Sequence, residues 1–244
     1  MFRRMSRLLV SFVMIMAGAV IGVGATSGTA HADECYTWSR TLSEGSSGGD
    51  VTQLQIRVAG WVTSGERLSY DGQFGARTTA AVKKFQAAYG LTADGVAGPQ
   101  TFSKIYALQD ADCTPVHFTY AELNRCNSDW SGGAVSAATA KANALKTMWK
   151  LEAMRHALGD VSVTVSSGFR SYACNNAVGG SSTSRHLYGD AADLTGSPTL
   201  CRLAQQARTH GFSEILGPGY PGHNDHTHVA LDPSPYWSAP TCGI

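Results

Sequence analysis

Charged residues are scarce in this sequence of 244 residues: Asp, Glu, Lys and Arg make up 15% of it, and the formal net charge is +1 at pH 7. No run of basic residues occurs beyond the N-terminus. Nucleic-acid-binding proteins need clustered Lys and Arg to neutralise phosphates. The composition therefore argues against nucleic acid as a partner, and with abundant Gly, Ser and Thr it is typical of an extracellular enzyme.

Long apolar runs are also missing after the N-terminus. One long apolar run does occur, near the N-terminus, from Leu8 to about Ala25. Three arginines lie before it in the first seven residues, and the small-x-small pattern Ala30-His31-Ala32 follows it. This order predicts a signal peptide over residues 1–32 rather than a stable membrane anchor. We therefore expect a secreted, extracellular protein whose mature chain begins at Asp33.

The six cysteines include no C-x-x-C pair, the spacing typical of thiolate metal sites and redox centres. An even number of cysteines in an exported chain favours disulfides, although many pairings are possible. Cys35 and Cys113 bracket a self-contained segment, and the other four could join the two halves of the chain beyond Cys113. The positions suggest the pairs Cys35–Cys113, Cys126–Cys174 and Cys201–Cys242.

The segment 33–113 contains no histidine and repeats itself. Asp71-Gly72-Gln73-Phe74-Gly75 is echoed by Asp94-Gly95-Val96-Ala97-Gly98, and each tight turn precedes a helical pattern. An earlier apolar stripe begins at Val51. These patterns predict a three-helix module without chemistry of its own. The polar linker that ends at Pro115 divides it from a second domain, residues 114–244.

The second domain has helical patterns early and strand patterns late. Ser136 can cap a helix over 137–158, and another helix is expected over 200–210. Strands are expected over 161–165, 191–194, 214–216 and 226–231, with a loop over 175–184. This order predicts an α+β fold with a small, mostly antiparallel sheet.

Histidines and aspartates gather in two short stretches of this domain. Ser184–Asp193 contains His186 and Asp193, and the second stretch is Asp225-His226-Thr227-His228. Three protein ligands and an open position are typical of a catalytic zinc site. Because seven extended residues span about 23 Å, His186 can approach Asp193 only through a turn, which Gly189 permits. Arg170 follows a strand end, where it could clamp a substrate carboxylate or form a salt bridge within the fold.

Both domains resemble known families. Gly48-Gly49-Asp50-Val51, the two Asp-Gly turns and Val82–Gln86 resemble the peptidoglycan-binding module of bacterial wall hydrolases. Ser184-x-His186-x-x-Gly189-x-Ala191-x-Asp193, Asp225-His226-x-His228 and Gly168-Phe169-Arg170-Ser171 resemble the actinomycete zinc D-Ala-D-Ala carboxypeptidases. That superfamily also contains the vancomycin-resistance D,D-dipeptidases and the hedgehog domain. The resemblance implies a module that targets the wall.

The second resemblance also implies a role for each residue. His186, Asp193 and His228 would bind one zinc ion, Asp225 would be the general base, and His226 would stabilise the oxyanion. Arg170 would hold the C-terminal carboxylate, and Tyr220 and His223 would line the pocket. We expect a monomer that acts on D-Ala-D-Ala-terminated peptides of peptidoglycan. Two alternatives remain: an endopeptidase of the same fold, and a non-catalytic wall-binding protein or metal-dependent adhesin.

Overall fold

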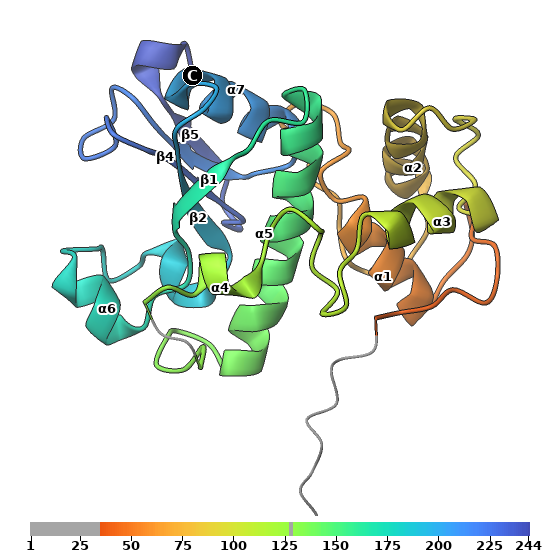
Figure 1. Ribbon diagram of the computed structural model, residues 1–244, viewed down its shortest axis with the longest axis horizontal. Helices are drawn as coiled ribbons and strands as arrows, with labels where there is room; N and C mark the ends of the chain where they lie inside the picture. Colours follow the sequence, from red (N-terminus) through yellow and green to blue (C-terminus); the bar gives the residue numbers. More distant parts are fainter. Residues whose placement is uncertain (1–34, 127–128) are drawn as a thin grey trace, which may run out of the picture. The chain divides into compact units, whose positions relative to one another are not determined.

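The structure, a computed structural model, describes residues 35–126 and 129–244 (Figure 1). The expected signal peptide over residues 1–32 lies outside this range. Three disulfides join Cys35 to Cys113, Cys126 to Cys174 and Cys201 to Cys242. Among the described residues, no helix combines the length and the apolar character that crossing a membrane requires.

The N-terminal module contains the three helices expected from its sequence: α1 (Gly49–Arg57), α2 (Ala76–Ala88) and α3 (Pro99–Ala107). Pro99 occupies the start of α3, where a missing backbone N–H leaves no hydrogen bond unmade. Leu54, Val82 and Ile105, one from each helix, are fully buried in the same apolar core. The helices therefore bury their apolar faces against one another.

Two buried glutamines hold the repeated Asp-Gly turns of the module. The amide of Gln55 donates to Oδ1 of Asp71 at 2.9 Å and accepts from the backbone N–H of Gly72 at 3.0 Å. Gln86 makes the corresponding bonds to Asp94-Gly95, both at 2.9 Å. The sequence repeat is thus a repeated hydrogen-bonded unit. In each copy, a glutamine on a helix makes hydrogen bonds to the Asp-Gly turn that follows that helix.

The second domain has the helices α4 (Tyr120–Leu123), α5 (Ala137–Ala157), α6 (Tyr172–Ala177) and α7 (Leu200–Thr209), with 3₁₀ turns η1 (Arg185–Tyr188) and η2 (Pro240–Cys242). Ser136 caps α5 by accepting from the N–H of Thr139, as its sequence predicts. The loop expected over 175–184 begins later than predicted, because α6 continues through Ala177.

Five strands form one sheet in the order β1-β2-β4-β3-β5: β1 (Thr164–Ser167), β2 (Ala191–Thr195), β3 (Glu214–Leu216), β4 (Thr227–Ala230) and β5 (Tyr236–Ser238). All pairs are antiparallel except β3 with β5, so the mostly antiparallel expectation is confirmed. The strand predicted over 161–165 is present as β1, but its predicted start was wrong. β1 begins at Thr164, because its partner β2 ends at Thr195, opposite Thr164. β5 was not predicted.

Helix α5 is buried on two sides, whereas its sequence pattern predicts one apolar stripe. Met148, Leu151 and Met154 pack in the core beneath the sheet. Trp149 and Ala153 belong instead to the core of the N-terminal module. Accordingly α5 contacts both α1 and β2. The second domain thus contributes to the hydrophobic core of the first.

Candidate active site

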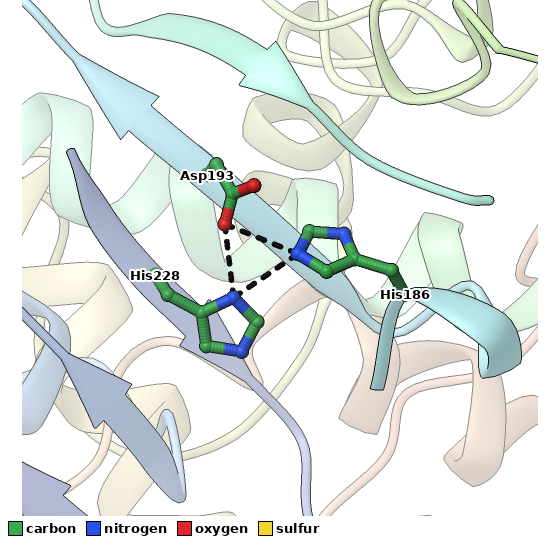
Figure 2. A group of neighbouring side chains, drawn as sticks. All are labelled: His186, Asp193 and His228. Atoms are coloured by element: carbon green, nitrogen blue, oxygen red, sulfur yellow. Dashed lines mark hydrogen bonds and ion pairs between the residues drawn. The ribbon is translucent and has the colours of Figure 1, made fainter. Parts of the chain in front are cut away.

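Three buried side chains from three different elements point at one another (Figure 2). Nε2 of His186 lies 3.1 Å from Oδ1 of Asp193 and 3.1 Å from Nδ1 of His228, and the third edge, from His228 to Asp193, is 2.9 Å. Each residue exposes 5% of its surface or less. The two stretches singled out in the sequence therefore meet in space.

The sheet register and one glycine bring these residues together. Asp193 on β2 lies directly opposite His228 on β4, so both side chains project from the same face. His186 lies on η1, and Gly189 then turns the chain into β2 with a φ of 75°. A Cβ atom at Gly189 would lie 2.4 Å from the carbonyl oxygen of Ala140. Only glycine fits this turn.

Each histidine uses its second ring nitrogen in a further hydrogen bond. Nδ1 of His186 lies 2.6 Å from the carbonyl oxygen of Gly168, and Nε2 of His228 lies 2.9 Å from Oε1 of Glu214. Since both oxygens are acceptors, these nitrogens carry the hydrogen, which leaves the lone pairs of His186 Nε2 and His228 Nδ1 free for a ligand. Glu214 was not identified from the sequence, where only its place in a strand was predicted.

The electrostatics of the cluster favour a cation. Burial alone raises the pKa of Asp193, but the two histidines outweigh burial and hold this pKa far below its usual range. Burial lowers the pKa of His186. It opposes the charge on His228 too, yet hydrogen bonds to Asp193 and Glu214 raise the pKa of His228 to about 9. Two carboxylates thus face the ring of His228, and a metal cation bound at Nδ1 would take the place of the proton there.

The donor set fits a zinc ion. Two imidazole nitrogens and one carboxylate oxygen are ligands typical of catalytic zinc sites, which keep one position open. With metal–ligand distances of ~2.0–2.1 Å, ligand atoms around a tetrahedral zinc ion are separated by roughly 3.3 Å. The observed edges of 2.9–3.1 Å are close to this value.

Arg170 supports the cluster directly. Its Nη2 donates to Oδ2 of Asp193 at 2.6 Å, and its Nε donates to Oγ of Ser167 at 2.9 Å. Asp193 therefore offers Oδ1 to the cluster and Oδ2 to Arg170. Of the two alternatives that the sequence left open, the structure shows the salt bridge. No described residue accepts a hydrogen bond from Nη1.

A cleft of about 630 Å³ lies over the three ligand candidates. Tyr220, His223 and His226 line it, as does Arg170. The ring centroids of His223 and His226 are 4.7 Å apart, and those of Tyr220 and His223 are 5.2 Å apart. The structure thus brings the expected pocket residues together in one wall of the cleft.

Asp225 is placed differently from the other site residues. Its side chain is 88% exposed, and Oδ1 accepts a hydrogen bond from Nδ1 of His226 at 2.8 Å, which lowers the pKa of Asp225. It is not among the residues that line the cleft. Nε2 of His226 lies 3.7 Å from Oδ1 of Asp193. The carboxylate is therefore linked to the cluster through the imidazole of His226.

Comparison with known proteins agrees with this geometry. Residues 116–230 match the peptidase M15 family, and residues 47–105 match a putative peptidoglycan binding domain. The chain is 67% identical over 233 residues to the zinc D-Ala-D-Ala carboxypeptidase of Streptomyces albus G, covering 95% of this chain and 91% of the relative. It is also 36% identical over 80 residues to a probable N-acetylmuramoyl-L-alanine amidase of Bacillus licheniformis, covering 31% of this chain and 22% of that protein.

Among solved structures, a Burkholderia AP3 phage endolysin is 35% identical, with 44% of this chain and 36% of that chain covered and a TM-score of 0.26. A similarity at this level carries no argument about the fold.

Proposed function

Since the chain belongs to the peptidase M15 family, together with the zinc D-Ala-D-Ala carboxypeptidase of Streptomyces albus G, we propose that it removes the terminal D-Ala from peptidoglycan stem peptides. One observation carries the proposal: three potential metal-ligand atoms, from His186, Asp193 and His228, lie within 3.1 Å of one another in the lining of a cleft.

In this proposal His186, Asp193 and His228 hold one zinc ion. Bound there, zinc polarises the scissile carbonyl and lowers the pKa of a water molecule towards neutrality. Gly168 and Glu214 fix the ring orientations of the two histidines, and Arg170 fixes the carboxylate of Asp193. The ligands are therefore held before substrate arrives, which reduces reorganisation during the reaction.

Asp225 and His226 act as a pair. Asp225 takes a proton from the attacking water and passes it to the leaving amine. Its exposed carboxylate reaches that water by leaving Nδ1 of His226, a movement that its position in the loop permits. His226 donates to the oxyanion from Nε2, which faces the cluster.

Arg170 and the cleft wall select the substrate. The unoccupied Nη1 of Arg170 can bind the C-terminal carboxylate, which an internal peptide bond does not offer. Tyr220 and His223 line the same cleft, where they would contact the bound peptide. This arrangement favours a carboxypeptidase over an endopeptidase.

We assign wall binding to residues 33–113 and catalysis to residues 114–244, in a monomer secreted through the signal peptide 1–32. The matches at 47–105 and 116–230 fall inside these two ranges, which supports the division. Deletion of the module is expected to weaken adsorption to purified wall. The shared core around Trp149 makes point substitutions on the module surface a cleaner test than truncation.

The experiment is to incubate the purified protein with a diacyl-Lys-D-Ala-D-Ala peptide and measure free D-Ala. We expect release that a chelator abolishes and added zinc restores. Cleavage of cross-linked wall without release of D-Ala from the peptide would identify an endopeptidase. Zinc binding without any hydrolysis would identify a metal-dependent wall-binding protein, and full activity in excess chelator would exclude a metal enzyme.

A further inference from the structure

A second cavity, of about 310 Å³, lies away from the candidate active site. Its residues come from the loop before α2, from the start of α2, and from α5 and the sheet region of the second domain. It shares no residue with the active-site cleft. Four polar side chains of its lining matter here: Arg67, Tyr70, Arg77 and Lys150.

The lining of this cavity is positively charged. Arg67, Arg77 and Lys150 line the cavity, whereas no Asp or Glu does, among the residues that the structure describes. Arg67 donates to the backbone carbonyls of Asp232 and Pro233, at 2.8 and 3.2 Å. These acceptors are neutral carbonyls, and among the described residues no ion pair engages Arg67, which is exposed. Within the described ranges, no hydrogen bond or ion pair holds the Arg77 side chain.

Lys150 is the buried member of this group. It exposes 2% of its surface, and Nζ donates to the carbonyl oxygens of Gly211 at 2.9 Å and Ala59 at 3.3 Å. An ammonium group has three hydrogens, so one remains for a further acceptor. Burial, and next to it the charge of Arg67, lowers the pKa of Lys150 to about 7. An anion in the cavity would stabilise the charged form.

Tyr70 provides an independent sign of a missing acceptor. Its hydroxyl is buried, and no described residue forms a hydrogen bond with it. Buried hydroxyls in native proteins nearly always have a partner, because an unsatisfied one destabilises the fold. Tyr70 lines the cavity beside the three cationic side chains. Since the hydroxyl has almost no accessible surface, a small rotation of the Tyr70 side chain would bring it to an oxyanion in the cavity.

We propose that this cavity binds an oxyanion of the phosphate class, held by the side chains of Arg67, Arg77, Lys150 and Tyr70. Three cationic groups match a dianion better than a single carboxylate, and guanidinium groups bind phosphate oxygens through paired N–H donors. The ligand is either free phosphate or a phosphate group of an anionic wall polymer. The site is separate from the peptidase cleft and independent of the reaction there.

The test uses the zinc-loaded mature protein and four matched proteins: wild type, Tyr70→Phe, Arg77→Ala and Arg202→Ala. Arg202 is an exposed arginine on α7 that does not line the cavity. Calorimetry measures binding of inorganic phosphate, and unfolding is followed with phosphate or with chloride at equal ionic strength. Loss of a charge-assisted hydrogen bond is expected to weaken binding about tenfold in the Tyr70 and Arg77 variants. Arg202→Ala should bind as wild type does.

The stability of Tyr70→Phe, measured without and with phosphate, tests the role of the hydroxyl. Without phosphate this variant should be at least as stable as wild type, because it only removes an unsatisfied hydroxyl, and it should gain less stability when phosphate is added. Equal phosphate binding by wild type and Arg77→Ala, or no difference between phosphate and chloride, would overturn the proposal. A glycerol phosphate oligomer distinguishes the sources: binding weakened by Arg77→Ala indicates a polymer phosphate, and binding of inorganic phosphate alone indicates the free ion.

Discussion

The carboxylate of Glu214 lies 2.9 Å from Nε2 of His228, on the side of the ring opposite to the proposed ligand atom. The sheet register makes this contact possible: Leu216 pairs with His228, and Glu214, two residues earlier on β3, shares its face. Such a bond orients the imidazole and increases the basicity of the nitrogen that binds metal.

Glu214→Gln should therefore weaken zinc binding while leaving the fold intact. The amide keeps a hydrogen-bond acceptor at the same place but removes the charge. Loss of a group that orients a metal ligand typically costs about 10- to 100-fold in affinity. Competition with a chromogenic chelator measures the zinc dissociation constant. Glu66→Gln, an exposed glutamate outside the cleft, is the matched control; an affinity equal to that of wild type in both variants would contradict the role of Glu214.

Asp225→Asn should separate catalysis from metal binding. The side chain is exposed and is not a proposed ligand, so the variant should fold and bind zinc as wild type does. Removal of a general base lowers kcat by about 100- to 10,000-fold. The measurement is kcat for D-Ala release, together with the zinc content of the same sample. A fully metallated variant with an unchanged kcat would show that another group accepts the proton.

Arg170→Lys should weaken both the binding of substrate and the hydrogen bonding that holds Asp193, a proposed zinc ligand. Lysine keeps the positive charge but cannot bond Ser167, Asp193 and a substrate carboxylate at the same time. Loss of one charged hydrogen bond corresponds to a decrease of about 10- to 100-fold in kcat/KM. Kinetics with peptides that end in a free carboxylate or in an amide check the assignment. If the ratio between these two substrates stays as in wild type, Arg170 does not bind the carboxylate.

Acid stability should depend on the repeated turns of the module. Hydrogen bonds from the N–H of Val96 and the amide of Gln86 lower the pKa of Asp94 below its ordinary value of 3.8. The unfolded chain then binds the proton at a higher pH than the folded chain, so this carboxylate stabilises the fold above pH ~4 and the contribution is lost as the pH falls further.

Asp94→Asn retains the acceptor oxygen but does not titrate. The free energy of unfolding of this variant, measured in urea between pH 5 and pH 2, should fall less steeply than that of wild type. Asp71→Asn in the first copy of the repeat should behave in the same way, because the pKa of Asp71 is lowered by the equivalent bond from Gln55. Parallel pH profiles of wild type and both variants would contradict this explanation.

Much of the site could be predicted from the sequence, because the chemistry lies in residue type and short spacing. His186, Gly189 and Asp193 lie within one turn and one strand, where local conformation decides what each side chain can reach. Residues whose contacts depend on pairing between distant strands could not be found in this way. Glu214 is one of them, and the engagement of Arg170 by Asp193 is another.

Residue type and spacing by themselves determined the repeated turns around Asp71 and Asp94, the helix that begins after Ser136 and the presence of two clusters rich in His and Asp. Tertiary structure alone decided that Trp149 joins the core of the module, that Lys150 and Tyr70 line one cavity, and that Asp193 faces His228. The reason is physical: turns and caps are satisfied by neighbouring residues, whereas burial and strand register depend on which distant segments pack together.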